Sequence, residues 1–321
     1  MILLRGILAA CAVALLSQPA AAQTYPNKPI RVIVSAPAGG VLDVTARLIA
    51  PGLSGLLGQQ LVIDNRGGAG GLIGAELAAK AIPDGYTLLI STPGALTILP
   101  HMRSVPYDTL RDFAPVGLIS SGPFLLLSHP TLPVKTLQDL LALARAQPGK
   151  LNYASSGNGV PNHLAMEILK SMTGISITHV PYKGQAQAVT DLLAGQMNLM
   201  FNSIATMLPH VRSGRLRVLG IASSKRSPQF PDTPTIAEAG VPGFEADIWF
   251  GMLAPANTPR RIISRLNDVL VKVVRAPETR AQFEALGADP VGSSPEEFAA
   301  FIRKETEKYA KVVKLSGAKV D

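Results

Sequence analysis

Two glycine-bearing stretches of this chain have residue types that bind small anions. Residues 36–43 read APAGGVLD and residues 155–163 read SSGNGVPNH, and each follows an apolar run that is expected to be a strand. Glycines let a backbone turn tightly and approach a ligand closely. The start of a helix presents unpaired N–H groups and the positive end of the helix dipole. Two such helix starts facing one cleft would bind a carboxylate without a metal or a cofactor.

Each stretch also has a purely structural interpretation. Gly39, Gly40 and the Gly157-Asn158-Gly159 segment could simply shape turns. Asp43 is expected to cap loop N–H groups, because a free carboxylate beside an anion site would repel the ligand. His163 precedes Glu167 by four residues and could share a metal with it, but two ligands without a third make a weak site. A histidine that holds the loop is the favoured interpretation.

Further candidates lie where other expected strands end. Ser91 and Thr92 end one strand, at the edge where α/β sheets bind ligands, and Tyr182 and Asn202 follow two others. Lys183 could pair with a distal carboxylate of the ligand or could be a solvated surface lysine. The GGAGGLIG segment at 67–74 lacks the G-x-G-x-x-G spacing of a dinucleotide site, so close packing of a helix start is favoured there.

Catalytic motifs are missing from the sequence. It contains no G-x-S-x-G elbow, no H-E-x-x-H and no phosphate-binding Walker loop, and its five histidines form no recognisable ligand set. Only a triad assembled from distant residues is left as a route to catalysis. We therefore expect no enzyme and no cofactor.

The N-terminus resembles a secretory signal peptide. Arg5 gives a positive start, residues 6–16 are almost wholly apolar, and Ala20–Ala22 match a cleavage site before Gln23. Cleavage after Ala22 predicts an exported protein of residues 23–321. The LAAC segment could instead place a lipid anchor on Cys11, but the apolar run continues beyond it, which favours simple cleavage. Cys11 is the only cysteine, so no disulfide is expected in the mature chain.

Composition indicates a compact globular protein that is long enough for two domains. Charged residues make up 16% and apolar residues 47% of the chain. The formal net charge is +8, but the basic residues are spread out and aromatics make up only 5%, which argues against a nucleic-acid partner. A mildly basic surface would favour anionic ligands.

Short apolar runs alternate with helical patterns, which predicts an α/β fold with helices on both faces of a parallel or mixed sheet. The segment 41–57 is expected to bury a stripe of Val41, Val44, Leu48 and Leu56. Expected strands are 30–36, 60–64, 86–91, 124–128, 151–155, 177–182, 197–201 and 216–222. Expected helices are 41–57, 71–82, one capped by Thr136 through about Ala146, 161–172, 185–194, one begun by a Thr258 cap and Pro259, and one opened by a Ser294–Glu297 capping box and ending near Leu315.

Five motifs in order resemble one known family. They are YPNKPIRVIVSAPAGGVLD, NRGGAGGLIGAELAAKAIPDGYTLL, YASSGNGVPNHLAMEIL, VPYKGQAQAVTDLLAGQMNLMF and WFGMLAPANTP. Together they resemble the receptor family of tripartite tricarboxylate transporters, the Bug or TctC-like extracytoplasmic solute-binding proteins. The resemblance extends from Tyr25 to about Gly317.

This resemblance implies a type II periplasmic-binding-protein fold, in which two α/β lobes joined by two crossover strands close on a ligand. One lobe would combine 23–124 with 247–321, and the other would be 125–246. The crossovers would lie near Gly122–Phe124 and Ala246–Phe250, with Trp249 packing between the lobes. Expected partners are a small carboxylate and the permease subunits of the transporter, and the receptor itself is expected to be a monomer. A sensor that presents its closed form to a receptor kinase is the alternative.

The resemblance also implies a ligand site formed mainly by the loops that match 36–43 and 155–163. The sequence departs from the family pattern at Ala36, where an aromatic residue is common, and at Val160, where Ser or Thr is usual. The expected ligand-binding residues are Ala36, Pro37, Ala38, Gly39, Gly40, Asp43, Ser91, Thr92, Ser156, Gly157, Asn158, Gly159, Val160, His163, Tyr182 and Asn202.

Overall fold

The computed structural model describes residues 25–316, so the expected signal peptide and Cys11 lie outside the described residues. The strands are β1 Ile30–Val34, β2 Leu61–Asn65, β3 Thr87–Ser91, β4 Phe113–Ser128, β5 Asn152–Ser155, β6 Thr178–Pro181, β7 Leu199–Ser203, β8 Arg217–Ile221, β9 Asp247–Pro255 and β10 Asp289–Pro290. The helices are α2 Val41–Leu57, α3 Leu72–Ala79, α4 Leu99–Met102, α5 Leu137–Ala146, α6 Pro161–Thr173, α7 Gln185–Leu193, α8 Ile204–Arg212, α9 Arg260–Arg275, α10 Pro277–Ala285 and α11 Pro295–Ser316. A 3-10 turn, η1 Ala69–Gly71, precedes α3, and a π-helical turn, η2 Gly94–Ile98, precedes α4. Within residues 25–316, no helix has both the length and the apolar composition needed to cross a membrane.

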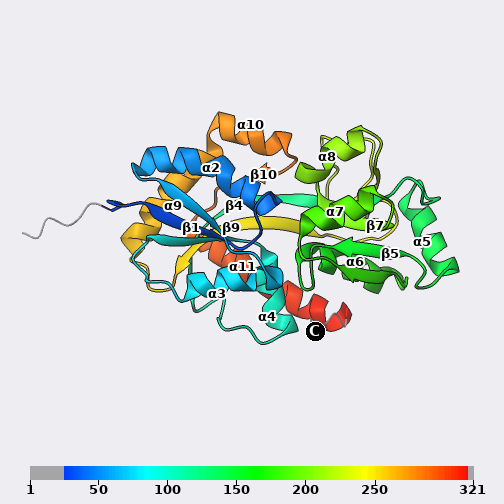
Figure 1. The fold of residues 1–321 in the computed structure, drawn as a ribbon, viewed down its shortest axis with the longest axis horizontal. Coiled ribbons are helices and arrows are strands. Elements are labelled where there is room, and N and C mark those ends of the chain that lie inside the picture. Colours follow the sequence, from blue (N-terminus) through cyan, green and yellow to red (C-terminus); the bar gives the residue numbers. More distant parts are fainter. Residues whose placement is uncertain (1–24, 317–321) are drawn as a thin grey trace, which may run out of the picture.

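A single mixed sheet runs through the molecule in the order β2-β1-β3-β9-β4-β7-β5-β6, and β8 and β10 also pair with β4. Strands β1, β2 and β3 are parallel to one another, as are β5, β6 and β7. In Figure 1, β4 and the yellow β9 connect a left half containing α2, α3 and α9 with a right half containing α5, α6 and α7. The alternation of strands and helices in the sequence is thus confirmed as an α/β fold.

The two parallel sets run in opposite directions. Strand β9 is antiparallel to both β3 and β4, so β4 runs in the same direction as β3. Strand β7 is antiparallel to β4 and therefore runs against β3. The carboxyl ends of β1–β3 and of β5–β7 consequently face each other across the middle of β4. The loops that follow these ends are the loops selected from the sequence.

Strand β4 is longer than the predicted strand, because its first part was not recognised as a strand. Its residues Phe113–Pro123 pair with β9, and from Phe124 onward it pairs with β7. The change of partner therefore falls within the expected crossover Gly122–Phe124. Elements η1, η2, α4, α8, α10 and β10 were not predicted either, and only the first part of β9 was expected, as the crossover near Ala246–Phe250.

The core confirms the strands but corrects the buried face of one helix. Helix α2 buries Leu42, Ala46, Ile49, Leu53 and Leu57, whereas two residues of the predicted stripe, Val44 and Leu56, are 38% and 48% exposed. Both faces of α2 carry apolar residues at helical spacing, so periodicity alone could not choose between them.

Helix starts confirm two predictions and correct a third. Thr136 accepts from the Asp139 N–H in a complete capping box, and Ser294 and Glu297 bond reciprocally at the start of α11. The expected Thr258 cap is wrong. Its hydroxyl donates to the Pro255 carbonyl at 2.7 Å, and α9 begins at Arg260, after Pro259.

The side chain of Trp249 also packs elsewhere than expected. Its indole ring packs edge-on against Phe298 and Phe301 of α11, and its Nε1–H donates to Glu305 Oε2 at 3.0 Å. The residue is therefore part of the core between β9 and α11, not a packing residue between the halves. An indole buries well only where its N–H finds an acceptor, and Glu305 supplies it.

Candidate functional site

Loops from the two parallel sets meet where the strand ends face each other, and we call this region the loop junction. It comprises residues 36–41, 66–71 and 92–94 from the first set and residues 156–161 and 182–184 from the second. A β-carbon built on Gly70 would lie 3.3 Å from the Asn158 carbonyl oxygen, and one on Gly94 would lie 3.3 Å from Pro161 Cδ. A β-carbon on Gly184 would lie 3.9 Å from Pro37 Cγ. Each of the two stretches that the sequence singled out thus approaches a loop of the opposite set.

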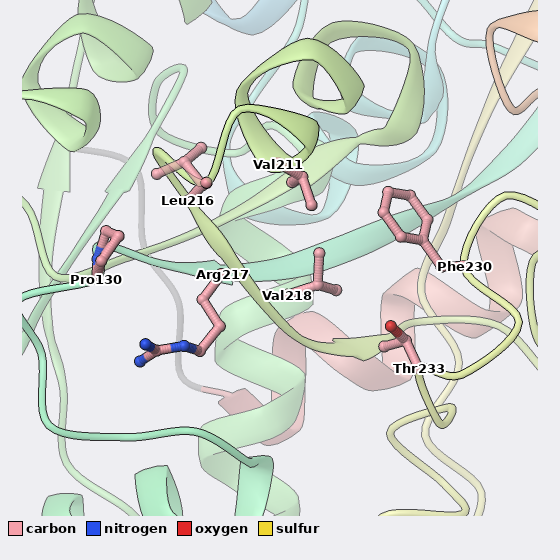
Figure 2. Close-up of a pocket in the computed structure, with 8 residues that line it drawn as sticks. Pro130, Val211, Leu216, Arg217, Val218, Phe230 and Thr233 are labelled. Carbon is pink, nitrogen blue, oxygen red and sulfur yellow. The ribbon is translucent and has the colours of Figure 1, made fainter.

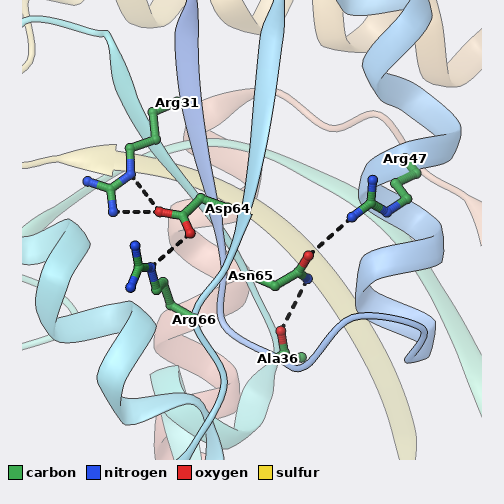
Figure 3. A network of polar contacts seen from close by, with 6 residues as sticks. All are labelled: Arg31, Ala36, Arg47, Asp64, Asn65 and Arg66. Atoms are coloured by element: carbon green, nitrogen blue, oxygen red, sulfur yellow. Dashed lines mark hydrogen bonds and ion pairs between the residues drawn. The ribbon is translucent and has the colours of Figure 1, made fainter.

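Asp43 organises the first loop from the first turn of α2. Its Oδ2 accepts from the Gly39 N–H at 2.9 Å, and its Oδ1 accepts from Arg47 Nε at 2.9 Å and from Asn65 Nδ2 at 3.0 Å. Burial alone would raise the pKa of this carboxyl, but the hydrogen bonds from Arg47, Gly39 and Asn65 outweigh it and lower the pKa. Asp43 therefore acts as the expected cap. Asn65 also donates to the Ala36 carbonyl, as Figure 3 shows.

A second, separate set of contacts engages Arg66, a cation that lies next to the first loop. Arg66 Nε donates to Asp64 Oδ1 at 2.8 Å, and Arg31 donates to Asp64 Oδ2 through two nitrogens (Figure 3). The pKa of Asp64 is lowered, because these bonds and charges outweigh a burial effect that acts in the opposite direction. Arg66 is thus paired with a carboxylate of the chain itself.

Polar side chains hold the second loop, residues 156–161, in place. Ser155 Oγ donates to the Gly157 carbonyl at 2.8 Å, accepts from the Gly157 N–H at 3.2 Å and bonds with His179 Nε2 at 2.6 Å. Because the hydroxyl has one proton, which it gives to Gly157, His179 Nε2 supplies the proton of the third bond. Asn162 Oδ1 accepts from Ser156 Oγ at 3.2 Å, and His163 Nδ1 accepts from the Gly159 N–H at 3.2 Å.

Two neutral histidines next to this loop are part of a stack of rings. The rings of His163 and His179 are 4.1 Å apart, and His179 stacks in turn on Tyr153 at 4.7 Å. Burial lowers the pKa of His163 to about 4 and that of His179 to about 3. Both rings are therefore uncharged at neutral pH, and His163 holds the loop as the sequence predicted.

Glu167 bonds to side chains other than His163, so the two residues are not arranged as a shared metal site. Glu167 Oε1 accepts from Tyr153 Oη and from Lys170 Nζ, both at 2.6 Å. In the part of the chain between Tyr25 and Ser316, no three His, Cys, Asp or Glu side chains are arranged to hold a metal ion.

Helix starts provide the remaining donors at the loop junction. Helices α2 and α6 begin after Gly40 and Val160 without a side-chain cap, so their first N–H groups are not satisfied by a side chain. Helices α9 and α10 also lack a side-chain cap, so this feature alone does not define a site. At the junction, however, each of these two starts lies on a loop that approaches the opposite strand set, and each carries the positive end of a helix dipole.

Side chains at the other strand ends mostly bind neighbouring residues. Ser91 Oγ lies 2.8 Å from Ser35 Oγ, and Tyr182 Oη donates to Asp191 Oδ2 at 2.7 Å, which together with burial raises the pKa of Tyr182 to about 12. Asn202 Oδ1 accepts from the Ser203 N–H at 2.8 Å and from Gln185 Nε2 at 2.9 Å. Asn202 thereby ties the starts of α7 and α8 together.

Some residues that shape the junction were not among the sequence candidates. They are all polar, and the first three lie at or beside the carboxyl ends of strands: Ser35, Asn65, Ser155, His179 and Gln185. A polar residue that ends an apolar strand is the signal that could have identified Ser35, Asn65 and Ser155. His179 lies inside β6, so only the tertiary stack reveals its role.

Two hollows lie outside the predicted site residues. One of about 390 Å³ is lined by residues around β8 and shares none of the predicted residues (Figure 2): Pro130, Val211, Gly214, Leu216, Arg217, Val218, Phe230 and Thr233. A cavity of about 10 Å³ lies between Val41, Ser203 and crossover residues such as Pro123 and Ile248. The second cavity holds about one water molecule.

Comparison with known proteins agrees with this architecture. The family described as "Tripartite tricarboxylate transporter family receptor" matches residues 45–317. Protein BugT of Bordetella pertussis is 41% identical over 95% of this chain and 94% of its own length. A protein encoded in the tcbD–tcbE intergenic region of Pseudomonas sp. (strain P51) is 40% identical over 96% of this chain and 93% of its own length.

Solved structures extend the comparison to the fold. R. palustris Rpa4515 with adipate has a TM-score of 0.88 and 38% identity, covering 92% of this chain and 100% of that one. MatC from Rhodopseudomonas palustris with bound malate has a TM-score of 0.85 and 32% identity, covering 90% and 100%. The periplasmic binding protein BugD has a TM-score of 0.86 and 32% identity, covering 92% and 99%. The fold is the two-lobe, type II fold of these binding proteins, and the chain belongs to the receptor family of the tripartite tricarboxylate transporters.

Proposed function

We propose that this protein captures a small organic acid at the loop junction and delivers it to the permease subunits of a tripartite tricarboxylate-type transporter. One observation carries the proposal: the uncapped starts of α2 and α6 lie on loops from opposite strand sets, and each loop approaches a loop of the other set. A carboxylate between them would receive N–H donors from both sets.

A few hydrogen bonds of this kind are strong enough for micromolar affinity. A charge-assisted hydrogen bond contributes about 1.5–3 kcal/mol, and a micromolar dissociation constant requires about 8 kcal/mol. A few backbone donors with some apolar contact would reach this value. The N–H groups of Gly39, Gly157 and Gly159 already bond within the chain, so the proposed donors are those of Gly40, Val41, Asn158 and Val160.

We propose that residues 23–124 and 247–321 form one lobe and residues 125–246 the other, in a monomeric and periplasmic protein. The change of partner along β4 between Pro123 and Phe124 supports the first boundary. Loops of the two sets approach each other at Pro37 and Gly184, which supports a movement of the lobes that admits the ligand. Binding would then favour the closed arrangement, which the permease would recognise.

Two relatives were solved with adipate and with malate, which makes these dicarboxylates suitable first probes. Isothermal titration and thermal-shift measurements with adipate, malate, hexanoate and amino acids should find at least one acid that binds and raises the melting temperature. If no organic acid stabilises the protein, the proposal fails.

A matched pair of variants locates the site. Gly40→Val adds a side chain at the start of α2, where a β-carbon would meet only the Pro37 carbonyl, at 3.6 Å. We expect at least tenfold weaker binding with little loss of stability. Gly55→Val, in the same helix and with open space around it, should bind normally. Equal affinity of the two variants would place the ligand elsewhere.

The transport role has its own test. Deleting the gene should abolish high-affinity uptake of the identified acid, and restoring it with Gly40→Val should leave uptake impaired. Normal uptake combined with a lost transcriptional response to the acid would favour the sensor role instead.

A further inference from the structure

Asp247 lies where the chain passes from one half of the sheet to the other. The Ala246 N–H donates to the Ala222 carbonyl, beside β8, whereas Asp247 pairs with Pro123 at the last position of the β4–β9 ladder. On the partner strand, Phe124 already pairs with Ser203 of β7. Both crossover segments therefore change partners within one residue of the Asp247–Pro123 pair. This pair lies at the pivot between the halves.

Asp247 is partly buried, and one oxygen of its carboxyl group is shut off from solvent. Its Oδ1 is completely covered, and no donor of the described residues reaches it. Pro123, on the facing strand, has no N–H to offer. An ionised carboxylate with an unsatisfied, covered oxygen is costly, whereas the protonated acid avoids most of that cost.

The charges around Asp247 also favour its protonated form. Glu305 and Lys308 approach from α11, Asp289 from β10, and Glu245 from the segment before β9. Lys308 is the one cation of this group, and its Nζ is 3.4 Å from Glu305 Oε1. Burial first, and then the surrounding acids, Glu245 foremost, raise the pKa of Asp247 to about 7 against the opposing effect of Lys308.

Elements that adjoin Asp247 are anchored in the other half of the molecule. The turn between α10 and β10 packs against α8, because a β-carbon on Gly287 would lie 2.3 Å from Ile204 Cγ2. Gln229 Nε2 also donates to the Glu284 carbonyl at the end of α10, at 2.6 Å. A rotation about the crossovers would therefore shift this turn, and with it the surroundings of the Asp247 carboxyl.

We propose that Asp247 is a proton-binding site that sets the relative position of the two lobes. The neutral acid fits the packed pivot described above. The carboxylate favours a rotated arrangement in which water also reaches Oδ1. By linkage, conditions that protonate Asp247 favour the unrotated arrangement described above, and ligand binding to that arrangement takes up protons. The expected movement of the lobes is independent of the proposed function. Only the effect of this movement on ligand affinity rests on the proposed function.

The experiment measures the separation of the lobes without any ligand. The only cysteine, Cys11, falls in the expected leader, so spin labels can be placed at Leu77→Cys on α3 and Met172→Cys on α6, both exposed positions. Electron–electron distance measurements are then made from pH 5.5 to 8.5. We expect the label distance to change with a midpoint near pH 7, and Asp247→Asn to keep the low-pH distance throughout.

Two variants shift the midpoint in opposite directions, which a purely structural role for the carboxyl would not do. Lys308→Met removes the opposing cation and should move the midpoint to higher pH. Glu245→Gln removes the strongest acidic neighbour and should move it to lower pH. Glu307→Gln, an exposed acid on α11 that does not act on Asp247, should leave it unchanged. A distance that is constant with pH, or a transition that survives Asp247→Asn, overturns the proposal. If Asp247→Asn fails to fold, an absence of the two opposite shifts overturns it as well.

The link to affinity is tested separately. Titration calorimetry with adipate at pH 7, in buffers of different ionisation enthalpy, should report proton uptake that Asp247→Asn abolishes. Binding of adipate without proton uptake would contradict the link to affinity but leave the proposed function standing.

Discussion

His163 and His179 stack with their ring centroids 4.1 Å apart and their planes within 8° of parallel. Each ring also bonds to the second loop, His163 through Gly159 and His179 through Ser155. A charge on either ring would face its neighbour at short range in a poorly solvated site. The pair therefore supports the loop only while both rings are neutral.

Acid should destabilise the protein through His163. Its pKa is about 4 in the folded protein and 6.5 for a solvated histidine in the unfolded chain, so the unfolded chain binds more protons in this range. The stabilisation is complete above pH 6.5 and is lost as the pH falls toward 4, by about 3 kcal/mol. Urea unfolding at pH 7, 5.5 and 4.5 measures it.

His163→Asn is the matched control, because its amide oxygen can still accept from the Gly159 N–H. The difference in stability between the two proteins should shrink as the pH falls. Taking the difference removes the contribution of Asp247, which acts in the opposite direction between pH 4 and 7. A difference that is independent of pH would contradict the neutral state of His163.

Asp43 should contribute far more to the free energy of unfolding than its ion-pair partner Arg47. Asp43→Ala leaves the Gly39 N–H and Asn65 without their acceptor and should cost about 1–3 kcal/mol of unfolding free energy. Arg47→Met removes only a cation that is 56% exposed, and should cost less than about 1 kcal/mol. Chemical denaturation of both variants decides the order, and equal costs would argue against the capping role.

Ser155 and Ser128 form a matched pair of fully buried hydroxyls. Ser155→Ala removes three hydrogen-bond contacts of the second loop and should cost about 1–3 kcal/mol. Ser128 Oγ has no partner among the described residues, so Ser128→Ala should be neutral or stabilising. We also expect Ser155→Ala alone to weaken ligand binding. Equal effects on stability would mean that the bonds of Ser155 are not formed in solution.

Lys183 should distinguish dicarboxylates from monocarboxylates if the proposed site is correct. It is exposed on the loop beside Gly184, which approaches Pro37 of the opposite set. We expect Lys183→Met to weaken adipate binding about two- to fivefold, as for an exposed ion pair, and to leave hexanoate binding unchanged. Lys225→Met, an exposed lysine elsewhere, is the control. An equal loss for both acids would indicate a role other than pairing with a second carboxylate.

Much of this fold could be predicted from local patterns. The short β-branched runs are strands, and the Thr136 and Ser294 boxes start α5 and α11 as predicted, because such signals act within a few residues. The buried face of α2 could not be predicted, because apolar residues lie on more than one face of the helix and the neighbours that pack against it decide which face is buried.

The glycine loops were recognisable because few residues suit a left-handed turn, and Gly39, Gly157 and Gly159 all have positive φ angles. The supports of these loops were not recognisable. His179 reaches Ser155 across two parallel strands, and Glu305 reaches Trp249 from a helix 56 residues later in the sequence. Contacts of this kind leave no local pattern.

The pairing of β3 with β9 has a consequence for the order of folding. Strand β3 finds this neighbour only after all of β4 to β8 has been synthesised, whereas β5, β6 and β7 are close in sequence and pair with one another. Closing a long loop costs more chain entropy than closing a short one. The strands β5–β7 can therefore pair as they emerge, and so can β1–β3, but the sheet between β3 and β4 is completed only when β9 and the C-terminal part of the chain are available.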